Sequence, residues 1–150
     1  MNKPAGIPQI AFIDLQAQRR RLGASIDEAV LRVVNHGGYV MGPEVKQIEA
    51  DLAAFCGARE VISCSNGTDA LTLVLRARGV GAGDAVLCPS FTFAATAEVV
   101  ALAGATPVFV DIDADTFNMN AESLEAGVVE ARRAGLNPVA VIPVDLFGLP

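Results

Sequence analysis

The 150-residue sequence lacks any apolar run long enough for a membrane-spanning helix. Such a helix needs about 20 consecutive, mostly apolar residues to cross the hydrocarbon core. The opening stretch, MNKPAGIPQIAF, also lacks the apolar centre of a secretory signal peptide. We therefore expect a cytoplasmic protein that has no membrane partner.

Cysteine and histidine are also scarce. The three cysteines, Cys56, Cys64 and Cys88, show no Cys-x-x-Cys spacing and have apolar neighbours in the sequence. An odd number in such surroundings favours reduced, buried thiols over disulfides or metal ligands. His36 is the single histidine, so no histidine cluster suggests zinc. The sequence therefore predicts no metal site.

Acidic residues outnumber basic residues, 17 to 11. The resulting net charge of -6 argues against a dedicated nucleic-acid-binding protein. Two nucleotide-binding motifs are missing as well. GxGxxG follows none of the predicted strands, and GxxxxGK[ST] is absent, which disfavours a dinucleotide fold and a P-loop nucleotidase. With 52% hydrophobic and 19% charged residues, the composition is that of a globular protein with a substantial core.

The pattern of apolar residues changes near residue 58. Before it, helical spacing covers Arg19–Asn35, and a second helical stripe begins at Pro43 and ends at Gly57. After it, strands and helices alternate, which predicts right-handed βαβ units and a mostly parallel sheet. The expected strands are Glu60–Cys64, Ala85–Pro89, Thr106–Asp111 and Val139–Pro143; the expected helices are Thr68–Arg78, Ala94–Ala103 and one capped by Asn120 that reaches Ala134.

We therefore expect an N-terminal helical segment, residues 1–58, and the first part of an α/β domain, residues 59–150. The last predicted strand leads into a loop at Pro150, without the helix that normally covers a parallel sheet. The α/β domain is thus expected to be incomplete at its C-terminus.

The sharpest local feature is Asn66-Gly67-Thr68, where a strand is expected to hand over to a helix. The first amides of a helix have no internal acceptor, and the helix dipole adds positive charge there. Gly67 would let a phosphate approach, and the Thr68 hydroxyl would be a further donor. The alternative is that Asn66 or Thr68 merely caps the helix, and spacing alone favours it. Asp69 would repel a phosphate, so it is assigned to the helix dipole or to a capping bond.

Two further segments are candidates for ligand contacts. Ser90–Thr96 follows a predicted strand at the edge where open α/β folds bind ligands, and an aromatic ring there could stack on a flat cofactor. Packing of Phe91 or Phe93 in the core is the simpler alternative. Gly37–Pro43 is a loop that holds the single tyrosine, Tyr39, and a plain connector is equally consistent with it. His36 is interpreted as a C-terminal helix residue favoured by the dipole.

Taken together and in order, these segments resemble the DegT-type sugar aminotransferases. The resemblance runs from Phe12 to Pro150 and depends on six motifs in the right order, each weak alone. They are Gly42–Val45, Ser65–Leu71, Pro89–Glu98, Gly104–Asp113, Phe117–Asn120 and Ile142–Gly148. One departure is Asp145, where many members of the family have histidine; this puts a substrate role at that position in doubt.

The resemblance implies the three-layer αβα large domain of the pyridoxal 5'-phosphate (PLP) transferases of fold type I, usually as a homodimer. It maps the cofactor-phosphate site to Asn66, Gly67 and Thr68, and the ring that stacks on the cofactor to Phe93. It places Tyr39, Met41 and Gly42 near the substrate. It also implies amino transfer from an amino acid, glutamate by expectation, to a nucleotide-linked keto-sugar, as in polysaccharide biosynthesis. The stretch from His36 to Val45 looks most like enzymes that aminate a 3-keto UDP-sugar uronate.

The lysine that binds the cofactor covalently and the aspartate that contacts the pyridine nitrogen are expected beyond Pro150. Lys3 and Lys46, the only lysines, match neither position. We therefore expect no catalytic residue in this chain and no transamination by these 150 residues alone. A PLP-dependent sugar dehydratase and a non-catalytic regulatory relative remain open as alternatives, because the missing region distinguishes them.

Overall fold

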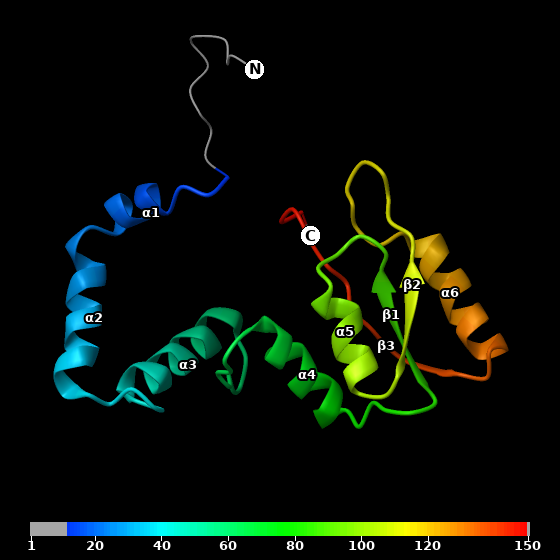
Figure 1. Cartoon of the computed structure of the whole chain (residues 1–150), viewed down its shortest axis with the longest axis horizontal. Coiled ribbons are helices and arrows are strands. Elements are labelled where there is room, and N and C mark those ends of the chain that lie inside the picture. The colour runs from blue at the N-terminus through cyan, green and yellow to red at the C-terminus, as the bar shows by residue number, and fades with distance from the viewer. Residues whose placement is uncertain (1–11, 150) are drawn as a thin grey trace, which may run out of the picture. The chain divides into compact units, whose positions relative to one another are not determined.

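The computed structural model of the chain describes residues 12–149 (Figure 1). Lys3 lies outside the described residues. Contacts divide the chain into two compact units, Met1–Ser63 and Cys64–Pro150. The boundary expected from the sequence, between residues 58 and 59, stays a prediction. Within residues 12–149, no helix combines the length and the apolar character needed to cross a membrane.

Among residues 12–63, the first unit contains three helices: α1 (Leu15–Leu22), α2 (Ala24–His36) and α3 (Pro43–Cys56). The single helix expected over Arg19–Asn35 is therefore wrong, because the chain breaks at Gly23. Gly23 has a φ of 60°, which favours glycine, and its N–H closes α1 by donating to the Arg19 carbonyl. Helical periodicity runs on through this break, so apolar spacing alone could not reveal it.

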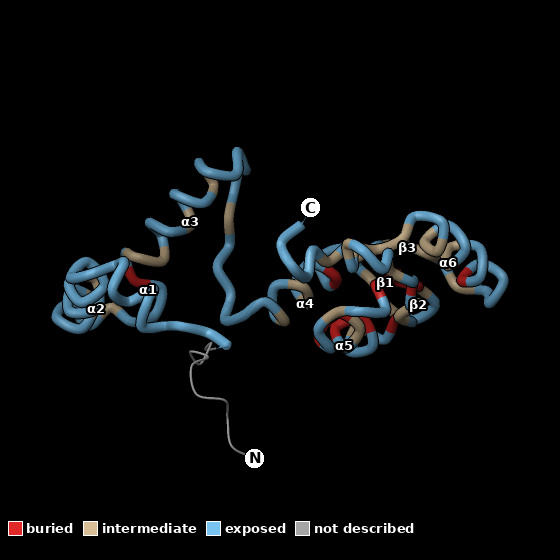
Figure 2. Tube along the Cα trace, turned by 90° about the horizontal axis from the view of Figure 1, so that it is seen from above, coloured by how far each residue is buried: buried red, intermediate tan, exposed pale blue. Residues whose placement is uncertain are grey.

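The first unit has almost no core. Gly42 is the only buried residue among residues 12–63, and Figure 2 shows the three helices largely exposed. Apolar side chains of α2 and α3 remain exposed, namely Ile26, Val30, Leu31, Val34, Ile48, Leu52 and Phe55. Two amphipathic helices thus keep their apolar stripes uncovered within this unit.

The second unit is built on a three-stranded parallel sheet. Its strands are β1 (Asp84–Pro89), β2 (Thr106–Val110) and β3 (Asn137–Val141), in the order β2-β1-β3. The three strands predicted here are confirmed. The strand predicted at Glu60–Cys64 is wrong, since this segment has no regular structure and Ile62 is exposed. A strand needs a neighbouring strand to complete its backbone hydrogen bonds. In the described part of the chain, no strand pairs with this segment.

Helices cover both faces of the sheet, so the expected three-layer αβα arrangement is confirmed (Figure 1). Val86 and Cys88 of β1 pack toward α4 (Gly67–Ala77) and α5 (Ala95–Leu102) in the buried cluster. Leu87 points the other way, toward α6 (Ala121–Arg133), where a Cβ at Gly127 would lie 3.1 Å from its Cδ2. Alternate residues of a strand face opposite sides, which explains this division.

Chain direction explains why the helices lie on opposite faces. From β1 the chain moves outward to β2 through α5, then returns past β1 to β3 through α6. Right-handed crossovers in opposite directions place their helices on opposite faces of the sheet. The segments that follow β1 and β3 consequently emerge side by side at the carboxyl edge of the sheet.

The expectation for the cysteines holds for only one of them. Cys88 is buried in β1, whereas Cys56 and Cys64 are exposed. The apolar neighbours of Cys56 do not bury it, because α3 has no packed core around it and Phe55 is 87% exposed. Apolar sequence neighbours indicate burial only where another element covers them.

Candidate functional site

A cavity of about 400 Å³ lies at the carboxyl edge of the sheet in the second unit. Three segments that are far apart in the sequence line it: the start of α4, the chain after β1 and the chain after β3. The lining residues are Gly67, Thr68, Leu71, Thr92, Phe93, Ala95, Thr96, Ile142, Pro143 and Val144. This is the edge where open α/β sheets bind ligands.

The N-terminus of α4 is capped in a way that leaves two amides open. The Asn66 side-chain oxygen accepts from the Asp69 N–H at 2.9 Å, and the Asn66 carbonyl accepts from the Ala70 N–H at 3.1 Å. Among residues 12–149, no group accepts from the amides of Gly67 and Thr68. The first two donors of α4 therefore stand at the cavity without a partner, where the helix dipole favours an anion.

Asp69 does not line this cavity. Its carboxylate accepts from the Ser65 hydroxyl and, at 3.3 Å, from the Asn66 side-chain amide. These bonds hold the negative charge at the cap, where it complements the helix dipole. Asp69 thus lies in the first turn of α4, as expected for a residue that serves the helix dipole, while its carboxylate bonds to side chains and caps no backbone amide. Asn66 serves as the N-cap, so the cap and the open amides exist side by side.

Gly67 leaves the space in front of these amides free. A Cβ built on Gly67 would meet no atom of the described chain within 4 Å. Packing inside this chain therefore does not require glycine at this position. Thr68 is half-buried at the cavity wall. The N-terminus of α4 is therefore accessible to a ligand.

Neither phenylalanine of the Ser90–Thr96 segment lies in the core. Phe93 is 72% exposed and lines the cavity. Phe91 contacts two other rings, with centroids 5.5 Å from Phe117 and 6.3 Å from Phe147. The alternative that Phe93 is a core residue is thus wrong, because the chain turns away from the sheet after β1 and presents its ring to the cavity.

Sequence reasoning missed several residues of the cavity. Thr92 and Thr96 face each other with their hydroxyl oxygens 2.9 Å apart, and Thr96 is buried. This bond fixes the turn that carries Phe93 between them. Because Thr92 precedes α5, which begins at Ala95, helical spacing gave no signal for this pair. Ile142–Val144 could be assigned only after β3 was placed beside β1.

Burial raises the pKa of the Cys88 thiol to about 11. Cys88 lies in β1, with its sulfur 3.6 Å from the Thr96 carbonyl oxygen in α5. The thiol stays protonated at neutral pH and acts as a small apolar group. It packs in the buried cluster of the second unit and offers no nucleophile.

The three residues expected near the substrate belong to the first unit. Tyr39, Met41 and Gly42 lie on the loop between α2 and α3, where Tyr39 and Met41 are exposed and Gly42 is buried. The structure thus brings Gly67, Thr68 and Phe93 together at one cavity, with Asn66 as the cap beside them. The ligand contacts of all seven residues stay predictions.

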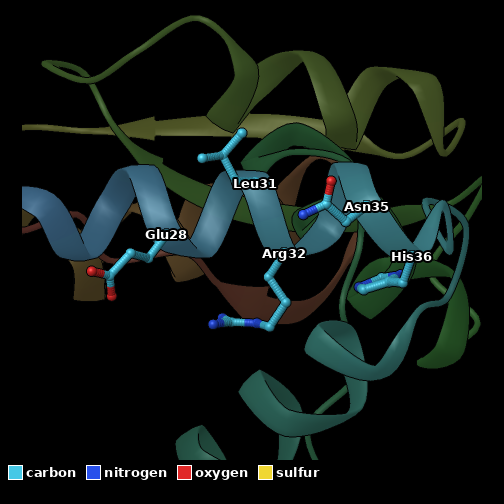
Figure 3. A pocket seen from close by; sticks show the side chains of 5 residues that line it. All are labelled: Glu28, Leu31, Arg32, Asn35 and His36. Carbon is cyan, nitrogen blue, oxygen red and sulfur yellow. The ribbon is translucent and has the colours of Figure 1, made fainter.

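A second and more open hollow of about 550 Å³ runs along α2 (Figure 3). Its lining side chains are Glu28, Leu31, Arg32, Asn35 and His36. All five lie beyond the first turn of α2, so none of them supplies a free amide of a helix N-terminus. The cavity at the end of the sheet is therefore the better candidate for an anionic ligand.

Comparison with known proteins identifies the family of the chain. A sequence profile of the DegT/DnrJ/EryC1/StrS aminotransferase family matches residues 20–150. The chain is 50% identical over 139 residues to a UDP-2-acetamido-2-deoxy-3-oxo-D-glucuronate aminotransferase of Pseudomonas aeruginosa. That match covers 93% of this chain and 37% of the relative, so the chain spans little more than a third of the relative's length.

Solved structures of aminotransferases are also similar to the chain. A DegT/DnrJ/EryC1/StrS aminotransferase from Brucella abortus superposes with a TM-score of 0.90 at 55% identity, over 95% of this chain and 38% of that one. NtdA from Bacillus subtilis, solved with bound cofactor PMP, superposes with a TM-score of 0.82 at 28% identity, over 98% and 33% of the two chains. The chain therefore belongs to the DegT/DnrJ/EryC1/StrS aminotransferase family.

Proposed function

We propose that this chain is the N-terminal part of a PLP-dependent aminotransferase that aminates a nucleotide-linked keto-sugar. The observation that carries the proposal is the meeting of two open helix amides with an exposed phenylalanine ring at one cavity. An anionic group and a flat ring joined in one ligand would match this pair of features. Membership of the aminotransferase family supports the same ligand.

The residues at the cavity fit pyridoxal phosphate. The amides of Gly67 and Thr68, with the Thr68 hydroxyl, would bind the phosphate, because a helix N-terminus favours an anion. The ring of Phe93 would stack on the pyridine ring. Bound PLP supplies an electron-withdrawing ring that stabilises the negative charge formed during amino transfer. The lysine and the aspartate that this chemistry needs are assigned to the sequence after Pro150.

For the substrate we propose a 3-keto UDP-sugar uronate, with glutamate as the amino donor. The His36–Val45 stretch supports this choice, and so does the Pseudomonas aeruginosa relative, whose name gives a 3-oxo-glucuronate sugar. We further propose a cytoplasmic homodimer. The uncovered apolar side chains of α2 and α3 support an association that would remove them from water.

The test uses the complete polypeptide, purified with PLP. The absorption band of the bound cofactor should disappear with borohydride, which should also fix the cofactor covalently to the protein. Incubation with glutamate and a panel of 3-keto and 4-keto UDP-sugars should give an amino sugar from the 3-keto compounds, detected by mass spectrometry. Amination of 4-keto sugars alone would refute the substrate proposal. Loss of a hydroxyl without gain of an amino group would instead identify a dehydratase.

A protein that binds no PLP would refute the enzyme proposal altogether and favour a regulatory relative. The homodimer is tested separately by light scattering of the same sample. A mass of one subunit at micromolar concentration would contradict it.

A further inference from the structure

His36 links the two ends of the loop between α2 and α3. Its Nδ1 lies 3.0 Å from the Gly38 N–H, which donates to it. Its Nε2 lies 3.1 and 3.2 Å from the two carboxylate oxygens of Glu44 in the first turn of α3. One imidazole therefore contacts the backbone where the loop leaves α2 and a side chain where the loop enters α3.

These contacts define the tautomer of His36. An Nδ1 atom that accepts from a backbone N–H must carry a lone pair, so the proton of the neutral ring is on Nε2. Nε2–H then donates to the Glu44 carboxylate. This bond, the largest of several contributions, lowers the pKa of Glu44. Both ring nitrogens are thus used, each in a different role.

Arg32 strengthens the same link. Its Nε lies 3.4 Å from the Glu44 carboxylate, and it precedes His36 by one helical turn. Figure 3 shows Arg32 and His36 on one side of α2, with Leu31 on the opposite side. Glu44 is therefore held by two side chains of α2, although all three groups keep contact with water.

The loop needs such a constraint because its backbone is unusual. Met41 has a φ of 51°, a left-handed conformation that a non-glycine residue adopts only when its surroundings enforce it. Gly42 approaches Gly38 so closely that a Cβ on Gly42 would lie 2.0 Å from the Gly38 carbonyl oxygen. Tyr39 and Met41 are exposed in this loop, with exposed fractions of 66% and 64%, and the Tyr39 hydroxyl donates to the Val34 carbonyl of α2 at 3.4 Å.

We propose that His36 is a positioning residue for the sugar-nucleotide substrate. By linking Gly38 to Glu44, it keeps the loop in the one conformation that presents Tyr39 and Met41. The proposal rests on the proposed function, since it needs a substrate that meets this loop. Without this link, the loop would sample other conformations. The entropy lost when the loop is ordered on binding would then weaken the affinity for the substrate.

The test compares three substitutions of His36 in the complete PLP-loaded protein. His36→Ala removes both bonds. His36→Asn restores an acceptor for the Gly38 N–H, because an asparagine side chain readily bonds to the backbone two residues later. His36→Gln places a donor near Glu44 instead. Asn35→Ala, the neighbouring position on α2, serves as the matched control.

We expect His36→Ala to raise the KM for the sugar nucleotide about tenfold, because both hydrogen bonds that order the loop are lost. The kcat, the PLP spectrum and the rate of the glutamate half-reaction should stay unchanged. His36→Asn should recover most of the lost affinity, His36→Gln only part of it, and Asn35→Ala should behave as the wild type. This split between KM and kcat separates positioning from general damage to the fold.

Two results would overturn the inference. One is an unchanged KM in His36→Ala; the other is a parallel loss of cofactor and kcat that His36→Asn does not rescue. Should His36→Ala fail to fold, Glu44→Gln tests the same link, because it replaces the charged acceptor and should raise the KM in the same direction. An unchanged KM there would also contradict the proposal. An inactive wild-type protein would refute the proposed function, which is a distinguishable result.

Discussion

The side-chain oxygen of Asn66 accepts a hydrogen bond from the Asp69 N–H at 2.9 Å and so caps α4 at its third amide. The first two amides, those of Gly67 and Thr68, are left at the cavity. The cap and the ligand site thus use different donors of the same helix. Capping and phosphate binding, which are alternatives when only spacing is considered, are compatible here.

Removal of this cap should loosen the start of α4. We expect Asn66→Ala to destabilise the first turn by about 1 kcal/mol. The peptide covering residues 65–72 should then exchange its amide hydrogens about fivefold faster, measured by mass spectrometry on the complete protein without cofactor. Asn66→Ser, which retains a capping oxygen, should exchange like the wild type. Equal exchange in Asn66→Ala and the wild type would show that the cap contributes nothing.

The Thr68 hydroxyl should contribute directly to cofactor affinity. Thr68→Val keeps the shape of the side chain and removes the donor, so the Kd for PLP should rise about 10- to 100-fold, the range for a bond to a charged group. The measurement is a fluorescence or absorbance titration of the protein without cofactor. Thr72→Val is the matched control, because the Thr72 hydroxyl donates to the Thr68 carbonyl inside α4 and does not line the cavity.

The ring of Phe93 should matter for the cofactor and little for stability. Its side chain is already 72% exposed, so Phe93→Leu should change the unfolding temperature by less than about 2 °C. Loss of ring stacking should weaken PLP binding about three- to tenfold. Phe109→Leu, an exposed position on β2, is the control and should leave the Kd unchanged. Equal Kd values for Phe93→Leu and the wild type would contradict the stacking role.

Helix caps and helix ends, which depend only on neighbouring residues, could be predicted well from the sequence. The expected helix Thr68–Arg78 differs from α4 by one residue at each end, and Asn120 caps α6 as expected, accepting from the Ser123 N–H at 2.8 Å. Asparagine caps and glycine stops act through neighbouring backbone atoms, so they can be recognised without knowing the fold.

Features that depend on distant partners could not be predicted in this way. The segment Glu60–Cys64 has the composition of a strand but finds no neighbour in the described chain. The exposure of Phe93 follows from the turn of the chain away from the sheet after β1, and the contribution of Ile142–Val144 to the cavity follows from the placement of β3 beside β1. The resemblance to a family supplied the roles of Gly67 and Phe93, because spacing alone favoured a cap and a core residue.

The three cysteines should differ sharply in reactivity. The thiolate is the reactive form, and the pKa of Cys88 is raised to about 11 by burial, so Cys88 should resist iodoacetamide at pH 8. As the pH rises from about 9 toward 11, the unfolded chain loses this proton while the folded chain keeps it. Stability should therefore decrease over that range. Mass spectrometry of labelled peptides, with and without denaturant, checks the first point; rapid labelling of folded Cys88 would contradict it.

These 150 residues alone should not transaminate. Their only lysines are Lys3 and Lys46, and neither matches the family position of the lysine that binds the cofactor. The purified fragment, supplied with PLP, glutamate and the keto-sugar, should give no amino sugar above a protein-free blank. The complete polypeptide is the positive control. Robust turnover by the fragment would show that the assignment of this chain is mistaken.

The most direct measurement is a crystal structure of the complete polypeptide with PLP bound. We expect phosphate oxygens at hydrogen-bonding distance, about 2.7–3.2 Å, from the amide nitrogens of Gly67 and Thr68, with the Phe93 ring over the pyridine. A phosphate bound at any other place, with these two amides facing only water, would contradict the account.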